Sequence, residues 1–89
     1  MKHRKYFLYM RATGICIASS CDFNSLRTSD MDHCDWAVIC KHPGKGRFEA
    51  RDISTGEFLP PAKCRKLVES LRKARARNGF AGELCVVCN

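Results

Sequence analysis

The sequence contains no long hydrophobic run. No stretch of about 18 consecutive apolar residues occurs in its 89 residues, so we expect no membrane-spanning helix and no membrane among its partners. It also has no internal repeat, no low-complexity tract and no linker. We therefore predict a single domain over residues 1–89. Hydrophobic residues make up 45% of the chain and charged residues 28%, which is typical of a globular protein rather than a disordered one.

The motifs of common active sites are also missing. The glycines of "HPGKGRF" (42–48) are typical of a turn and lack the strand–helix context of a phosphate-binding loop. The segment "DMDHCD" (30–35) lacks the glycine and the closing glutamate of a calcium loop. Its neighbouring His33 and Cys34 would point apart on an extended chain, so we interpret the segment as an acidic surface loop. We predict no enzyme activity and no cofactor.

Acidic residues are scarce where basic residues gather. The formal net charge is +7, and residues 62–78 contain seven Lys or Arg against the single acid Glu69. Surfaces that serve only solubility normally mix the two signs of charge. This imbalance favours an acidic partner, either nucleic acid or an acidic protein surface.

Alternating hydrophobic residues predict several short strands. We expect strands at 6–11 and 14–19, and a hairpin whose strands, 36–41 and 47–51, are joined by the turn "HPGKG". In the return strand, Phe48 and Ala50 should face the core and Arg51 the solvent. Residues 20–34 are polar and aperiodic, which predicts a long loop with one helical turn starting at Ser29.

The clearest helix signal lies at 61–78. Pro60 and Pro61 suit its start, Asn78-Gly79 suits its end, and Arg75 and Arg77 suit the negative end of its dipole. Its apolar residues recur at helical spacing and form one stripe: Cys64, Leu67, Val68, Leu71 and Ala74. We predict an α+β fold with a mostly antiparallel sheet of four or five strands, in which this helix covers one face. The predicted element order is three or four strands, then the helix, then a final strand inside the sheet.

That final strand is "ELCVVC" (83–88). Alternation would project Cys85 and Cys88 from opposite faces, and Val is a poor turn former, so we favour a buried strand over a zinc site. Structural zinc on Cys85 and Cys88 remains an alternative. Its further ligands would be Cys16 and Cys21, or residues from the set His33, Cys34, Cys40 and His42.

The cysteine count bears on location. Seven is an odd number, which fits a closed disulfide framework poorly, so we predict reduced cysteines used as small buried hydrophobic residues. The basic and partly apolar N-terminus imitates a signal peptide, but Arg11 interrupts its apolar stretch. We therefore predict a cytoplasmic protein.

The predicted function is the binding of nucleic-acid phosphates, without strong sequence specificity, by one basic side of the helix. The cations on the helix are Lys63, Arg65, Lys66, Arg72, Lys73 and Arg77. Further cations at the hairpin and the N-terminus are Lys41, Lys45, Lys2, Arg4 and Lys5. The alternative is an inhibitor or adaptor, of the kind that a phage or mobile element encodes, that docks on an acidic or nucleic-acid-binding protein surface. Its anchors would be Tyr6, Phe7 and Tyr9, together with Phe23 and Leu26.

Overall fold

Two antiparallel hairpins build one sheet. The computed structural model describes residues 4–41, 46–86 and 88. The first hairpin pairs β1 (Tyr6–Met10) with β2 (Cys16–Ser20), and the second pairs β3 (Trp36–Lys41) with β4 (Phe48–Arg51). Pairing of β1 with β3 joins them in the order β2-β1-β3-β4. The predicted antiparallel sheet is confirmed with four strands, and the turn at 42–45 lies outside the described residues.

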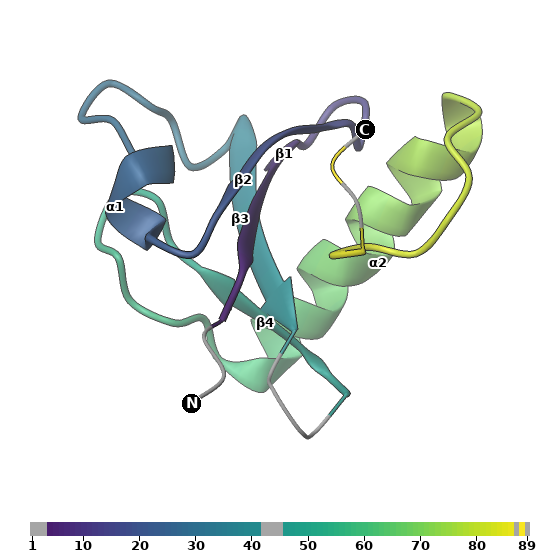
Figure 1. Cartoon of the computed structure of the whole chain (residues 1–89). Coiled ribbons are helices and arrows are strands. Elements are labelled where there is room, and N and C mark those ends of the chain that lie inside the picture. The colour runs from purple at the N-terminus through teal and green to yellow at the C-terminus, as the bar shows by residue number, and fades with distance from the viewer. Residues whose placement is uncertain (1–3, 42–45, 87, 89) are drawn as a thin grey trace.

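Both faces of the sheet are covered, by different helices. Figure 1 shows α2 (Pro61–Arg77) on one side and the short α1 (Phe23–Leu26) on the other. Alternate residues of β1 consequently enter different cores: Tyr9 packs towards α2 and Leu8 towards α1. Aromatic and aliphatic side chains suit such doubly covered strands. The predicted α+β class is confirmed, with α2 packed on one face.

The apolar stripe predicted for the long helix is the buried face of α2. Cys64, Leu67, Val68, Leu71 and Ala74 are all buried, and Leu71 is fully enclosed. Asn78 ends the helix, since its backbone N–H and its side-chain amide both donate to the Ala74 carbonyl. Neither of the helices described here has the length and hydrophobicity that crossing a bilayer requires.

The α1 face differs from the prediction. Asp22 caps a helical turn at Phe23–Leu26 by accepting the Asn24 backbone N–H at 3.1 Å, so the turn lies earlier than the expected start at Ser29. The side chains of Phe23 and Leu26, the first and last residues of this turn, are buried. The face of β4 that we expected to be solvated is therefore covered, and the Arg51 guanidinium lies 3.9 Å from the centre of the Phe23 ring.

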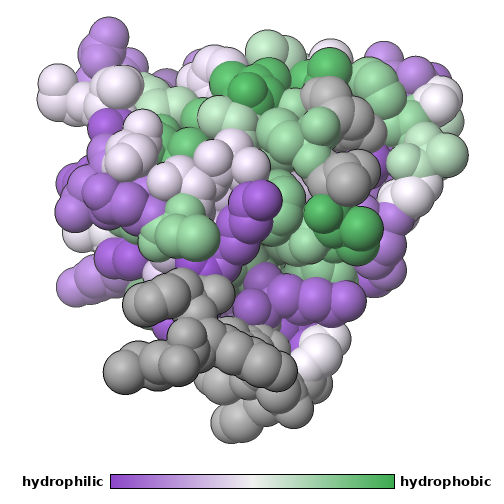
Figure 2. Space-filling view, in the orientation of Figure 1, coloured by the Kyte–Doolittle hydropathy of each residue, from purple (hydrophilic) through white to green (hydrophobic). Residues whose placement is uncertain are grey.

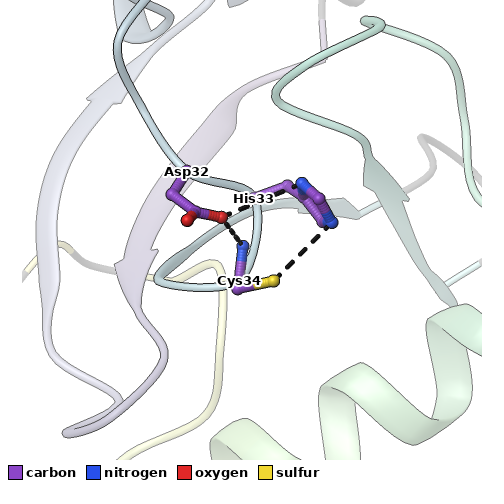
Figure 3. A group of neighbouring side chains, drawn as sticks. All are labelled: Asp32, His33 and Cys34. Carbon is purple, nitrogen blue, oxygen red and sulfur yellow. Dashed lines mark hydrogen bonds and ion pairs between the residues drawn. The ribbon is translucent and has the colours of Figure 1, made fainter.

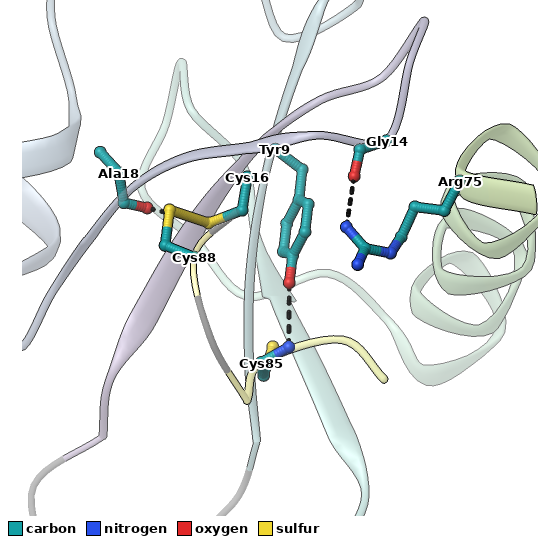
Figure 4. Close-up of a disulfide and its surroundings, with 7 residues drawn as sticks. All are labelled: Tyr9, Gly14, Cys16, Ala18, Arg75, Cys85 and Cys88. Carbon is teal, nitrogen blue, oxygen red and sulfur yellow. Dashed lines mark hydrogen bonds between the residues drawn. A yellow bond between two sulfur atoms is a disulfide. The ribbon is translucent and has the colours of Figure 1, made fainter. Parts of the chain in front are cut away.

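The final strand is absent from the described part of the C-terminal segment. Gly79 and Gly82 adopt positive φ angles of 77° and 94°, and the chain turns back there. Residues 84–86 form a turn instead of the predicted strand. Leu84 is fully buried in the α2-face core, and the Cys85 N–H donates to the Tyr9 hydroxyl at 2.9 Å (Figure 4). The Tyr9 hydroxyl thus accepts a backbone N–H that, in a sheet, would donate to a carbonyl of the neighbouring strand. These tertiary contacts outweigh the preference of Val86 for a strand.

A buried arginine joins α2 to the first hairpin. Arg75 is only 5% exposed, so it is more than the cation at the end of the helix dipole that its position predicts. It donates to the Gly14 carbonyl at 2.8 Å and to the Ala81 carbonyl at 3.2 Å, and it lies 5.9 Å from the Tyr9 ring centre. Figure 4 shows Tyr9 between this arginine and the Cys16–Cys88 disulfide.

The approach of α2 to the β1–β2 turn requires glycine at position 14. Its φ is +76°, and an added Cβ would lie 2.8 Å from the Arg75 backbone nitrogen. We expect Gly14→Ala to lower the free energy of unfolding by about 3 kcal/mol, from backbone strain and overpacking together. Gly79→Ala is the matched control, because its φ is +77° but nothing lies within 4 Å of the added atom. It should cost about 1 kcal/mol. Equal losses in urea unfolding would contradict the close approach.

The disulfide closes most of the chain into a loop. Cys16 and Cys88 are 72 residues apart, so the bond strongly restricts the unfolded chain. By the chain-entropy relation, we expect Cys88→Ser to lower the free energy of unfolding by about 4 kcal/mol. Adding a reductant to the wild type should lower its free energy of unfolding in urea by the same amount. Cys21→Ser, which removes an exposed free thiol, is the control. A wild type equally stable in both conditions would argue against the bond.

Candidate nucleic-acid interface

Six cations cover the outer side of α2 and are called the basic face. All six are exposed: Lys63, Arg65, Lys66, Arg72, Lys73 and Arg77. At about 100° per residue they divide into two groups. One flank of the helix carries Lys63, Lys66, Lys73 and Arg77, and the other carries Arg65 and Arg72. The helix is thus apolar beneath and cationic outside.

Most of this charge is not neutralised by the residues that the structure describes. Among the residues that the structure describes, Arg72 is the single member of the basic face with a carboxylate partner. Its guanidinium donates to both carboxylate oxygens of Glu83, at 3.3 and 3.0 Å. The Leu84 backbone N–H and this guanidinium lower the pKa of the Glu83 carboxyl. The sequence offered no sign of this pair, because the return of the chain after Gly79 creates it.

The predicted cations outside the helix are spread over several surfaces. Lys41 and Arg72 lie 5.7 and 5.4 Å from the same Phe48 ring centre, which brings Lys41 beside the basic face. Lys5 lies over Phe7, a residue of the α2-face core. Arg4 pairs with Glu49 at 3.1 Å and lies over Phe58, which also contacts Arg51. Arg4 therefore belongs to the α1 side. Lys2 and Lys45 lie outside the described residues.

A groove runs along the Lys63 flank of α2 and is called the Trp36 groove. It has a volume of about 540 Å³. Lys63, Lys66 and Ser70 line it from α2, and Arg11, His33 and Trp36 line it from the other side. The Arg11 backbone N–H donates to the Asp35 carbonyl at 2.9 Å, and its guanidinium donates to the His33 carbonyl at 3.1 Å. Sequence reasoning did not assign Arg11 or Trp36 to a site, and it considered His33 as a possible ligand of the alternative zinc site.

The segment Asp32–His33–Cys34 forms an exposed cluster beside this groove (Figure 3). The Cys34 sulfur lies 3.7 Å from His33 Nε2, whereas Asp32 Oδ1 lies 3.9 Å from His33 Nδ1. The thiol and the carboxylate thus lie beside different nitrogens of the His33 ring, rather than beside the same one. Asp32 also raises the pKa of the Cys34 thiol, which disfavours a nucleophilic thiolate. The predicted exposure of this loop is confirmed.

The seven cysteines occupy four environments: Cys21 and Cys34 are exposed, Cys85 is half-buried, Cys40 and Cys64 are buried, and Cys16 and Cys88 are bonded to each other. The prediction of buried cysteines is therefore wrong for Cys21 and Cys34. Cys40 and Cys64 are buried as predicted, and burial raises the pKa of Cys40 to about 11. Burial likewise raises the pKa of Cys85 to about 12. The prediction of reduced cysteines is wrong for Cys16 and Cys88, which are bonded to each other because the C-terminal segment returns to β2. With Cys88 so bonded, Cys85 and Cys88 do not present a pair of thiolates for zinc.

No protein-family model, curated protein or solved structure matches this chain. Its function is therefore inferred from the charge, exposure and contacts of the residues described above.

The electrostatic effect of Asp32 on Cys34 can be measured directly. Asp32→Asn removes the negative charge that raises the pKa of this thiol, so the thiolate should form at lower pH. We expect faster alkylation of Cys34 by iodoacetamide near neutral pH, with the curve of rate against pH shifted toward lower pH. Peptide mass spectrometry separates Cys34 from Cys21, the other exposed free thiol, which serves as the internal control. An unchanged Cys34 curve would contradict the assigned cause.

Proposed function

We propose that this protein binds nucleic-acid phosphates through the basic face of α2, without strong sequence specificity, and that it acts by binding rather than by catalysis. The observation that carries the proposal is the set of exposed cations left without acidic partners within the described chain: Lys63, Arg65, Lys66, Lys73 and Arg77. Lys and Arg on a rigid scaffold are the groups that neutralise phosphates and release their counterions.

The dimensions of the basic face suit a phosphate backbone. Lys63 and Arg77 are 14 residues apart, which corresponds to about 21 Å along the helix axis. Phosphates of one strand of duplex DNA recur every 3.4 Å or so along its axis, so this length spans roughly six of them. Flexible lysine and arginine side chains on both flanks can reach such an array without reading base edges. Weak sequence preference follows from contacts of this kind.

For location we propose the cytoplasm. Five of the seven cysteines are free thiols, which fits a reducing compartment. The Cys16–Cys88 bond fits that compartment less well, since disulfides are rare there.

A second candidate is the adaptor or inhibitor that docks on an acidic or nucleic-acid-binding protein surface. The anchors expected for it are all buried in the two cores and are not available to a partner: Tyr6, Phe7, Tyr9, Phe23 and Leu26. Other apolar side chains favour this candidate: Ile17 on β2 is 47% exposed, and Val86 in the C-terminal segment is 61% exposed. Figure 2 shows hydrophobic surface gathered in the upper part of the view, where β2 and this segment lie.

Charge removal tests the first proposal. We expect Lys66→Gln with Lys73→Gln to weaken the binding of labelled duplex DNA roughly tenfold or more at about 50 mM salt. The slope of log affinity against log salt should become shallower by about 0.9 for each phosphate that the variant no longer neutralises. Fluorescence anisotropy at several salt concentrations measures both quantities.

The control for this pair changes the net charge equally but on the α1 side. Asn24→Asp with Thr28→Asp alters exposed residues in and just after α1 and adds two negative charges, so it also lowers the net charge by two. It should retain most of the affinity and slope. Equal weakening by both pairs would mean that net charge, rather than the basic face, drives binding. Absence of any binding at about 50 mM salt would overturn the proposal.

A further inference from the structure

The Trp36 groove concentrates positive charge between two walls. Lys63 and Lys66 line one wall and Arg11 the other. Asp52 is the single carboxylate among the lining residues, and it already accepts the Ser54 and Thr55 backbone N–H groups at 2.7 and 3.1 Å. Arg51 lines the groove as well, but its guanidinium is stacked on Phe23. An anion with more than one charged group would therefore meet cations on both sides.

The groove on the opposite flank of α2 is less suited to an anion. Its volume is about 830 Å³, and its lining includes Arg47, Arg65 and Arg72, together with Lys66, which borders both grooves. Two carboxylates, those of Glu49 and Glu69, face the same space. The Trp36 groove has the more uniform positive charge and is the one that contains a tryptophan.

Trp36 is held in place by the sheet. It begins β3, is paired with Met10 of β1, and packs against the α1-face core while remaining partly exposed. It also lines an adjoining cavity of about 490 Å³, where Met10 and Ala12 are among its neighbours. A partly exposed tryptophan that lines a groove together with Lys and Arg residues is an arrangement that single-strand-binding proteins use to stack bases. Duplex bases are already stacked on each other and cannot occupy such a site.

We propose that the Trp36 groove binds a nucleotide of a single strand, with its base against Trp36 and its flanking phosphates held by Lys63, Lys66 and Arg11. This inference rests on the proposed function and adds to it the form of nucleic acid that is preferred. The volume of the groove lies within the range of roughly 300–1,000 Å³ that is usual for ligand clefts. Lys63 and Lys66 also belong to the basic face, so a strand leaving the groove would continue along α2.

The chain contains a single tryptophan, which makes Trp36 its own fluorescent probe. We would titrate the wild-type protein with three labelled ligands of equal length: oligodeoxythymidylate, an abasic oligodeoxynucleotide and a duplex. Anisotropy of the label reports binding, and tryptophan emission reports contact with Trp36. Oligodeoxythymidylate should quench the emission in step with binding. The abasic strand should bind more weakly, by roughly 5- to 150-fold, without comparable quenching.

Variants separate the groove from the rest of the basic face. Trp36→Leu keeps an apolar side chain but removes the ring, so it should bring the affinities for the thymidylate and abasic strands close together. Trp36→Phe should restore part of the difference. Lys73→Gln, at a basic-face position that does not line the groove, should weaken both strands and leave their ratio unchanged.

The outcomes separate this inference from the proposed function. Thymidylate binding without quenching, or equal quenching by the abasic strand, would overturn the base contact while leaving phosphate binding intact. No anisotropy change with any of the three ligands would overturn the proposed function and this inference with it. Because the first two readouts use wild-type protein, they hold even where Trp36→Leu fails to fold.

Discussion

Burial of the apolar stripe of α2 against the sheet is the interaction on which the rest of this structure depends. It encloses Leu67, Val68 and Leu71 over strands that are already covered on their other face by α1. Because α2 buries its apolar side, the same packing turns six of its seven Lys and Arg residues to the solvent, and Arg75 alone of the seven is buried. The position of the basic face is therefore a consequence of core packing, and a change that loosened α2 would disperse its charge.

Arg75 and Tyr9 extend this packing beyond the helix. Arg75 reaches the β1–β2 turn through Gly14 and the C-terminal segment through Ala81. The Tyr9 hydroxyl accepts the Cys85 N–H, and the Cys16–Cys88 bond holds the same segment to β2. The two terminal nitrogens of the Arg75 guanidinium and the Tyr9 hydroxyl thus have hydrogen-bond partners at this junction, as the cost of leaving buried polar groups unpaired requires. The returning segment also carries Glu83 to Arg72, so it reduces the charge of one flank only.

That asymmetry bears on function. The flank bearing Lys63 and Lys66 keeps its charge and borders the groove that contains Trp36, whereas the flank bearing Arg65 and Arg72 faces carboxylates. Phosphate attraction alone would act across the whole basic face. Stacking on a fixed ring would act at one place and on unpaired bases only. Under the two proposals, the protein would attract nucleic acid broadly and hold single strands preferentially.

The sequence by itself determined the four strands, the long helix, its apolar stripe and its six exposed cations, because periodicity and turn residues are local signals. It did not determine the course of the C-terminal segment, where Val86 lies in a turn instead of a strand because Leu84 and Cys85 find partners in the core. Burial of Arg75, the disulfide and the Trp36 groove were likewise decided by tertiary structure. Each joins residues far apart in the chain, and such contacts leave no periodic trace in the sequence.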